Sequence, residues 1–250
     1  MAKKRYNMGE MTWPEIKDAL ETVKAAIIPV GSQEQHGPNI TENCDSVRAE
    51  KFSGLLAERL YPKVIVTPTL SFGLSYHHMS FPGTITLSPD TFKAILRDIA
   101  ISLAQHGINK VIICNAHSGN DAIVEVAIEE IRNDIDIKIS SFTYHYLIWE
   151  DIKKIVETDI FGHACEFEVS EMLYLAPEYV RKDKITKGTI KENAGRYLDN
   201  RFKIGVNFEV LTENGALGDA RKANYEIGEK IINNALDEAE KFVEYFMDEV

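Results

Sequence analysis

Four short, largely apolar runs alternate along the chain with longer stretches of helical period. Runs of this kind bounded by turn residues predict strands that are buried on both faces of a sheet. The predicted strands cover residues 25–30, 64–70, 110–115 and 137–144. Between and after them, apolar residues recur at the three- and four-residue spacing of an amphipathic helix. The chain is therefore predicted to alternate strands and helices.

Capping residues indicate where the helices begin, because serine, threonine and aspartate side chains satisfy free amides at a helix N-terminus. The predicted helices cover residues 12–23, 47–60, 89–106, 120–134, a segment that begins near 163 and a segment from 219 to the C-terminus. Thr12, Ser46, Ser88 and Asp219 are the predicted caps, and Gly107 is predicted to end the helix that begins after Ser88.

Strands separated by helices of this length are typical of parallel βαβ units. We therefore predict an α/β fold, a three-layer α/β/α sandwich with a mostly parallel central sheet. No repeat, low-complexity tract or glycine- and serine-rich linker interrupts the pattern, so residues 1–250 are expected to form a single domain. In such sheets, ligands bind at the loops that follow the carboxyl ends of the strands.

Composition and charge restrict the partners. The 250 residues are 44% hydrophobic and carry a formal net charge of −11, which disfavours nucleic acid and anionic membrane surfaces. No stretch has the form of a secretion signal or a membrane span, so a cytoplasmic protein is expected. The three cysteines have no CxxC spacing, which argues against disulfides and thiolate zinc sites. A Cys165 nucleophile paired with His163 is a minor alternative.

Acidic and imidazole side chains gather directly after three of the predicted strands. Glu34, His36 and Asp45 follow the first strand, and the histidines of YHH at 76–78 follow the second. His117 follows the third, within NAHSGN. Because the carboxyl ends of parallel strands meet at one edge of a sheet, we expect these groups to share one cleft.

The donor types indicate a metal site of oxygen and nitrogen ligands, suited to zinc, manganese or iron. Asp45 could bridge two divalent ions, with Glu34 and His117 on one and His36 on the other. Two ions about 3.5 Å apart can hold a hydroxide and polarise a carbonyl, which suits hydrolysis of an amide. GxSxG, Walker, GxGxxG and HExxH motifs are absent, so the catalytic mechanisms that depend on these motifs have no support in the sequence.

Several spaced motifs together resemble the creatininase, or creatinine amidohydrolase, family. They occur in the family's order from about residue 11 to about residue 235 and read PVGSQEQHGP, FPGT, NAHSGN, GHACEFEVSEMLYLAP and GALGDARKANYEIGEKI. The resemblance implies an α/β/α amidohydrolase that uses a metal-bound hydroxide on a non-peptide C–N bond. It also implies two divalent ions and a homo-oligomer, commonly a hexamer.

The resemblance also assigns roles residue by residue. Glu34, His36, Asp45 and His117 match the family's metal ligands, with Asp45 bridging, and His163 matches a catalytic histidine near the scissile bond. Two acids, Glu166 and Glu168, match the acids that follow that histidine. His78 and Ser118 are expected to contact the substrate.

This chain departs from creatininase at one metal ligand. Creatininase has a glutamate two positions after the NGH histidine, where this chain has Gly119. We expect Glu168 to replace it as a metal ligand, with Glu166 as the next candidate. If Glu166 is not a ligand, we expect it to be a second catalytic residue. A one-metal enzyme is the fallback. In creatininase, a tryptophan packs against creatinine. This chain has no tryptophan at the matching place, and Trp149 is only the nearest candidate, so creatinine itself is not the expected substrate.

Three functions therefore stay open. The first is hydrolysis of an amide, cyclic amide or formamide of a small molecule. The second is a formamide hydrolase acting on a formylamino-pyrimidine ribotide in flavin or deazaflavin biosynthesis, for which the basic stretch 181–203 could attract a phosphate. In the third, the chain is a metal-stabilised scaffold without catalysis. The expected partner is a small amide, with neither nucleic acid nor membrane.

Overall fold

A four-stranded parallel sheet lies at the centre of the protein. The computed structural model describes residues 6–158, 161–192, 194–197 and 204–250. The strands are β1 (Ala25–Val30), β2 (Val64–Val66), β3 (Lys110–Asn115) and β4 (Lys138–Thr143), in the order β2-β1-β3-β4. Every neighbouring pair is parallel. The predicted α/β fold with a mostly parallel sheet is confirmed.

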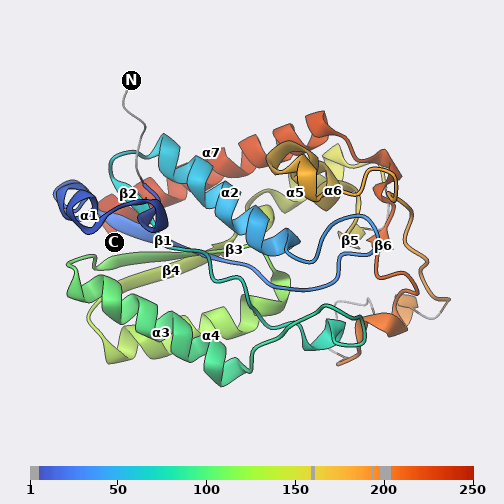
Figure 1. The fold of residues 1–250 in the computed structure, drawn as a ribbon, viewed down its shortest axis with the longest axis horizontal. Helices are drawn as coiled ribbons and strands as arrows, with labels where there is room; N and C mark the ends of the chain where they lie inside the picture. The colour runs from blue at the N-terminus through green and yellow to red at the C-terminus, as the bar shows by residue number, and fades with distance from the viewer. Residues whose placement is uncertain (1–5, 159–160, 193, 198–203) are drawn as a thin grey trace.

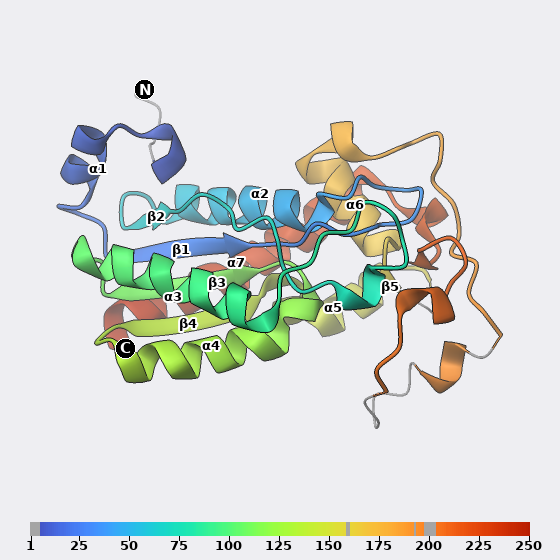
Figure 2. The same cartoon turned by 60° about the horizontal axis from the view of Figure 1, so that its bottom comes forward.

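Helices cover both faces of this sheet (Figures 1 and 2). On one face lie α3 (Pro89–Gln105) and α4 (Asp121–Asp134), and on the other lie α2 (Cys44–Arg59) and the long α7 (Tyr225–Glu249). Among the described residues, no helix is both long enough and apolar enough to cross a membrane.

Alternation along the strands divides the apolar core into two layers. In β1, Ala25 and Ile27 pack with the α2 and α7 side, whereas Ala26 and Ile28 pack with the α3 and α4 side. Successive strand residues point to opposite faces of a sheet. Because both faces are covered, β1 and β2 are apolar throughout and β3 is apolar at its centre, whereas β4 at the sheet edge has the mixed sequence KISSFT and is only partly buried.

Smaller elements extend the protein beyond the carboxyl ends of the sheet strands. A two-stranded antiparallel sheet pairs β5 (Phe161–His163) with β6 (Leu217–Gly218). It lies at the same end of the protein as the loop after β1 (Figure 1). Two more helices, α5 (Trp149–Ile155) and α6 (Glu166–Leu175), flank this region, and α1 (Trp13–Ala19) lies at the opposite end of the sheet.

Three predicted helix starts were wrong. The second long helix begins at Cys44 instead of Val47, because the Ser46 hydroxyl donates to the Ser32 and Ser71 carbonyls and caps nothing. The helix expected near His163 begins at Glu166. The final helix begins at Tyr225 after an Asn224 cap, while Asp219 caps a short 3₁₀ turn.

The other starts were predicted correctly. Thr12 and Glu15 form the reciprocal hydrogen bonds of a capping box at α1, and Ser88 accepts from the Thr91 amide at the start of α3. Gly107 has a positive φ of 86° directly after α3, a conformation that glycine adopts without strain. β2 ends at Val66, so the predicted strand over 64–70 was too long.

Close contact between the end of β1 and the start of α2 fixes the position of the first turn of α2. Gly31 lies so near this turn that a Cβ atom on it would overlap the main chain of Ser46 and of Asp45. Replacing Gly31 with alanine is expected to push α2 away from β1 and to lower the free energy of unfolding by about 1–3 kcal/mol. Thermal unfolding measures this loss, and divalent metal binding should weaken in the same variant.

Gly195→Ala is the matched control, because a Cβ there meets no atom of the described residues within 4 Å. It is expected to leave both the midpoint of unfolding and metal binding unchanged. Equal behaviour of the two variants would show that the approach of α2 to β1 does not depend on glycine.

Candidate metal centre

Loops at one edge of the sheet bring the predicted ligands together. Glu34 and His36 lie in the loop after β1, and His117 lies just after β3. Asp45 is the second residue of α2, which leads away from that edge. β1 and β3 are neighbours in the sheet, and the connections from them run in opposite directions, toward β2 and toward β4. Ligand sites in parallel α/β sheets form where the strand order reverses in this way.

The Asp45 carboxylate lies between two imidazoles. Its Oδ1 is 3.3 Å from Nε2 of His36, and its Oδ2 is 3.3 Å from Nδ1 of His117. On the far side of His117, Nε2 is 3.2 Å from Oε2 of Glu34. All four side chains are buried. Asp45 therefore faces a different imidazole with each of its oxygens, which is the arrangement expected of a carboxylate shared by two ions.

Buried polar atoms without hydrogen-bond partners indicate that this cluster fits metal ions. Nδ1 of His36 donates to the Glu34 carbonyl at 3.1 Å, so its Nε2 carries a free lone pair. Among the described residues, neither that Nε2 nor Oδ2 of Asp45 has a hydrogen-bond partner, although both atoms are buried. Such atoms are costly unless something else satisfies them. A divalent cation bound by oxygen and nitrogen donors would satisfy both.

Glu168 and Glu166 lie in different places. The candidate ligand atoms of Glu168, His36 and His163 all lie within 4.8 Å of one another. The Glu166 carboxylate instead accepts hydrogen bonds from the amides of Glu157 and Thr158 and from the Thr158 hydroxyl. Of the two acids, only Glu168 is among the described residues that line the cavity at the cluster.

The glutamate of creatininase could not be accommodated at position 119. A Cβ atom on Gly119 would overlap the His117 imidazole and the Leu74 carbonyl. Nε2 of His117 also approaches that carbonyl, at 3.1 Å, so the ring is held close to the main chain. A side chain at 119 would therefore displace His117 and disturb the cluster.

Gln35 fixes the tautomers of two further histidines. Its amide Nε2 approaches Nδ1 of His78 at 2.8 Å and donates to the Gly215 carbonyl, while its Oε1 accepts from the Gly37 amide. This network makes Nδ1 of His78 the acceptor, so the hydrogen is on Nε2, which lies 3.4 Å from Oε1 of Glu34. Nε2 of His163 donates to the Gln35 carbonyl at 2.5 Å. His163 therefore presents the lone pair of Nδ1, which lies 3.7 Å from Oε1 of Glu34.

A cavity of about 560 Å³ opens onto the cluster. Predicted site residues line much of it, including Ser118, whose hydroxyl is 2.8 Å from that of Tyr146. Four further aromatic rings also line it: Tyr146, Trp149, Phe167 and Phe208. Among the described lining residues there is no lysine or arginine.

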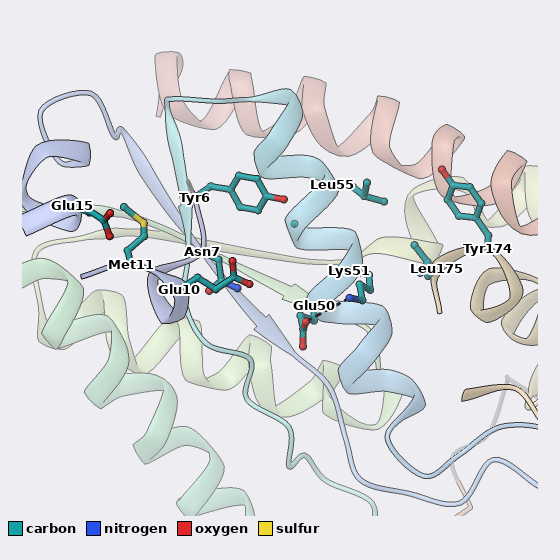
Figure 3. A pocket seen from close by; sticks show the side chains of 11 residues that line it. Tyr6, Asn7, Glu10, Met11, Glu15, Glu50, Lys51, Leu55, Tyr174 and Leu175 are labelled. Carbon is teal, nitrogen blue, oxygen red and sulfur yellow. Dashed lines mark ion pairs between the residues drawn. The ribbon is translucent and has the colours of Figure 1, made fainter. Parts of the chain in front are cut away.

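A larger cavity, of about 730 Å³, lies elsewhere on the protein and is shown in Figure 3. Residues of the N-terminal segment, α2 and α6 line it, including Tyr6, Glu10, Glu50 and Tyr174. None of the predicted site residues is among its described lining, and no histidine or cysteine is either. The smaller cavity is therefore the candidate active site, because predicted site residues line it.

Several residues of the site, Gln35 among them, were missed by the sequence analysis. Arg48, one turn after Asp45, donates to Glu168, and the Ser75 hydroxyl donates to Glu34 at 2.5 Å. His145 follows the fourth strand and lines the cavity, so the rule applied to the other strand ends would have found it. No sequence signal identified Arg48, because the predicted helix began too late to include Asp45.

Burial and mutual interaction displace the pKa values of the cluster in the absence of metal. Burial, opposed by His117, raises the pKa of Glu34 to about 7. Burial alone would lower the pKa of His117, but Glu34 and Asp45 raise it to about 9. Buried Asp45 has a pKa well below its usual range because His36 and His117 outweigh its burial. Burial raises the pKa of Cys165, which does not suit a nucleophile.

A parallel α/β sandwich with buried carboxylates and imidazoles at the carboxyl edge of its sheet defines a class of protein with a candidate metal centre. The chain belongs to the creatininase family, because the family model described as creatinine amidohydrolase matches residues 9–243. The resemblance seen in the sequence motifs is confirmed.

Three curated relatives differ in what they are named for. The creatinine amidohydrolase of Pseudomonas putida is 28% identical over 71% of this chain and 75% of its own length. The 3-dehydro-scyllo-inosose hydrolase of Thermotoga maritima is 27% identical over 95% and 82%. The mycofactocin precursor peptide peptidase of Mycobacterium ulcerans is 25% identical over 91% and 83%.

Solved structures share the fold over nearly the whole chain. One described as creatininase Mn has a TM-score of 0.83 and 24% identity, and covers 98% of this chain and 100% of its own. A mutant creatininase of the Zn-Zn type has a TM-score of 0.83 and 25% identity, with the same coverage. Neighbours in the family therefore carry manganese or zinc.

The displaced pKa values predict a pH-dependent stability without metal. Glu34 and His117 both hold their protons more tightly in the folded chain than in the unfolded chain, so their contribution falls as pH rises from about 5 to about 9. The unfolding midpoint of the metal-free protein should fall by several degrees between pH 7 and pH 9, where the histidines with a lowered pKa, such as His78 and His163, are neutral in both states. Mn²⁺ should raise the midpoint more at pH 9 than at pH 5, because ligands must be deprotonated to bind.

Glu34→Gln isolates one of these groups in thermal unfolding. The difference in unfolding midpoint between this variant and the unchanged chain should shift in favour of the variant as pH rises from 5 to 8, because the glutamine never has to ionise. A constant difference between the two proteins across that range would contradict the raised pKa of Glu34.

Proposed function

We propose that this protein hydrolyses a C–N amide bond of a small molecule at two divalent metal ions. Glu34, Asp45 and His117 would hold the first ion, and His36, Asp45 and Glu168 the second. The observation that carries this proposal is the Asp45 carboxylate, which faces one imidazole with each oxygen at 3.3 Å. The free buried atoms Nε2 of His36 and Oδ2 of Asp45 support it.

Zinc and manganese fit this set of three carboxylates and two imidazoles. When bound, two such ions lower the pKa of water and polarise a carbonyl group. Iron, the third metal expected from the sequence, has the same donor preference. The count of two ions rests on the shared carboxylate and on Glu168 in place of a ligand at position 119.

His163 is proposed to move the proton. Its lone pair at Nδ1 accepts a proton from the attacking water as the new C–O bond forms, and the imidazolium then gives that proton to the nitrogen as the C–N bond breaks. Burial and His36 lower the pKa of His163, so it starts neutral and able to accept. Nε2–H of His78 lies 3.4 Å from Oε1 of Glu34, and this N–H is proposed to donate to the substrate.

The cavity favours a small amide without a phosphate group. Aromatic rings of Tyr146, Trp149 and Phe208 can pack against a flat substrate, and the Ser118 hydroxyl at the rim can bind a polar group. No lysine or arginine is among the described lining residues, so the walls offer no such partner for a ribotide phosphate. Residues 193 and 198–203, part of the basic stretch 181–203, lie outside the described residues.

Glu166 is proposed to position the loop at 157–158 through its hydrogen bonds, not to act on the substrate. A peptide-type amide is the second candidate substrate, since a relative is named as a peptide peptidase. Cytoplasmic location and assembly as a homo-oligomer, for which a hexamer is the family's common form, stay predictions.

Amide hydrolysis after removal and return of metal tests this function. The chelated protein should be inactive, and Mn²⁺ or Zn²⁺ should restore turnover of at least one substrate in a panel of creatinine, other cyclic amides, formamides, a formylamino-pyrimidine and short peptide amides. An acyclic amide should release amine and carboxylate in equal amounts, whereas a cyclic amide should give a single ring-opened carboxylate, and both kinds of product are measured.

His163→Asn is the matched variant, since asparagine keeps a hydrogen-bond donor near the Gln35 carbonyl but cannot shuttle the proton. It should retain two metal ions per chain and lose turnover by roughly 10²–10⁴-fold. Two bound ions with no turnover of any amide by the unchanged chain would instead support the non-catalytic scaffold.

A further inference from the structure

A buried arginine lies directly behind the second proposed metal position. Arg48, on α2, has no exposed surface, and Nη1 donates to Oε1 of Glu168 at 2.8 Å. The same Nη1 is 3.4 Å from Oδ1 of Asp45 and 3.5 Å from the Ala116 carbonyl. One guanidinium nitrogen therefore contacts two carboxylates from different helices, α2 and α6.

The other side of the guanidinium is held by a second set of contacts. Nε is 2.9 Å from Oε2 of Glu171 and 2.9 Å from the Tyr144 hydroxyl, and Nη2 is 2.7 Å from the same Glu171 oxygen. The Tyr144 hydroxyl itself donates to Glu171 at 2.8 Å. The Tyr144 and Phe167 rings flank the guanidinium, with centroids 5.5 and 5.8 Å from its central carbon. The group has little freedom to move.

Stability alone does not explain why a charged arginine is buried at this position. Removing arginine, glutamate and their contacts in favour of apolar packing often costs nothing, so a buried pair is weak evidence of a purely stabilising role. A cation beside a metal position also opposes metal binding unless its charge is balanced. Glu171 supplies that balance on the side away from the metal, while Arg48 keeps its hydrogen bonds to Asp45 and Glu168.

We propose that Arg48 is a positioning residue for the second metal: it orients the carboxylates of Asp45 and Glu168 as ligands, and Glu171 neutralises its charge. The inference rests on the ligand assignment of the proposed function. Asp45 is shared by both positions, but Arg48 contacts its Oδ1, the oxygen that faces His36, and not its Oδ2, which faces His117. Among the described contacts Arg48 touches neither Glu34 nor His117, so its main effect is on occupancy of the second position.

Metal titration of the Arg48→Lys variant tests this role. Lysine keeps the charge but has no planar fork, so it cannot hold two carboxylates and Glu171 together. Isothermal titration of the metal-free protein with Mn²⁺ should show the Kd of the second ion raised by roughly 10–100-fold, as for other groups that orient metal ligands. The Kd of the first ion should change less than about 3-fold, well below that range.

The Glu171→Gln variant is an independent test of the same role, because it leaves Arg48 unchanged. Without its counter-charge, the guanidinium opposes the second ion, so the second Kd should again rise while the first does not. Arg59→Lys is the control on the same helix, because Arg59 pairs with Asp237 and Glu240 far from the cluster. It should leave both Kd values unchanged.

The outcomes separate this inference from the proposed function. Two ions bound by the unchanged chain, with the second weakened in Arg48→Lys and Glu171→Gln, support the positioning role. Lower unfolding midpoints in both variants with both Kd values unchanged would overturn it and leave a structural role for Arg48. Absence of any metal binding by the unchanged chain would instead overturn the proposed function.

Discussion

The structure of the site depends on one buried carboxylate that two imidazoles share. Asp45 faces His36 with one oxygen and His117 with the other, and Arg48 approaches from behind. Burying a carboxylate among polar groups is costly unless charges or hydrogen bonds compensate it. Here protonated imidazoles can compensate it without metal, and divalent ions can do so in their place. The fold therefore tolerates both states, at different pH.

The sheet provides this arrangement because its strands are parallel and adjacent. β1 and β3 end at the same edge, so Glu34, His36 and His117 need only short loops to meet. Asp45 comes from α2, which starts close to the end of β1 because Gly31 has no side chain. Gly119 similarly leaves room for the His117 ring. Small residues at two loop positions thus set the distances within the cluster.

Much of the fold could be predicted from the sequence, and part of the site could not. Every sheet strand was found, because β1, β2 and β3 are largely apolar, and β4, although it contains Lys138 and two serines, also carries residues that favour strands, such as Ile139 and Phe142. The start of α2 was missed because Ser46 resembles a cap, although its hydroxyl bonds to two distant carbonyls. Arg48 was missed for the same reason, since only a helix that includes Asp45 places the two residues one turn apart. The tautomers set by Gln35 depend on Gly215, 180 residues away, which no local pattern reveals.

Anomalous diffraction from crystals grown with Mn²⁺ tests the shared carboxylate most directly. With data from both sides of the manganese absorption edge, we expect two peaks, one on each side of Asp45 and about 3.5–4 Å apart. Glu34 and His117 should contact one peak, and His36 and Glu168 the other. A single peak held by Glu34, His77 and His117, whose candidate ligand atoms also lie within 4.8 Å of one another, would contradict the account.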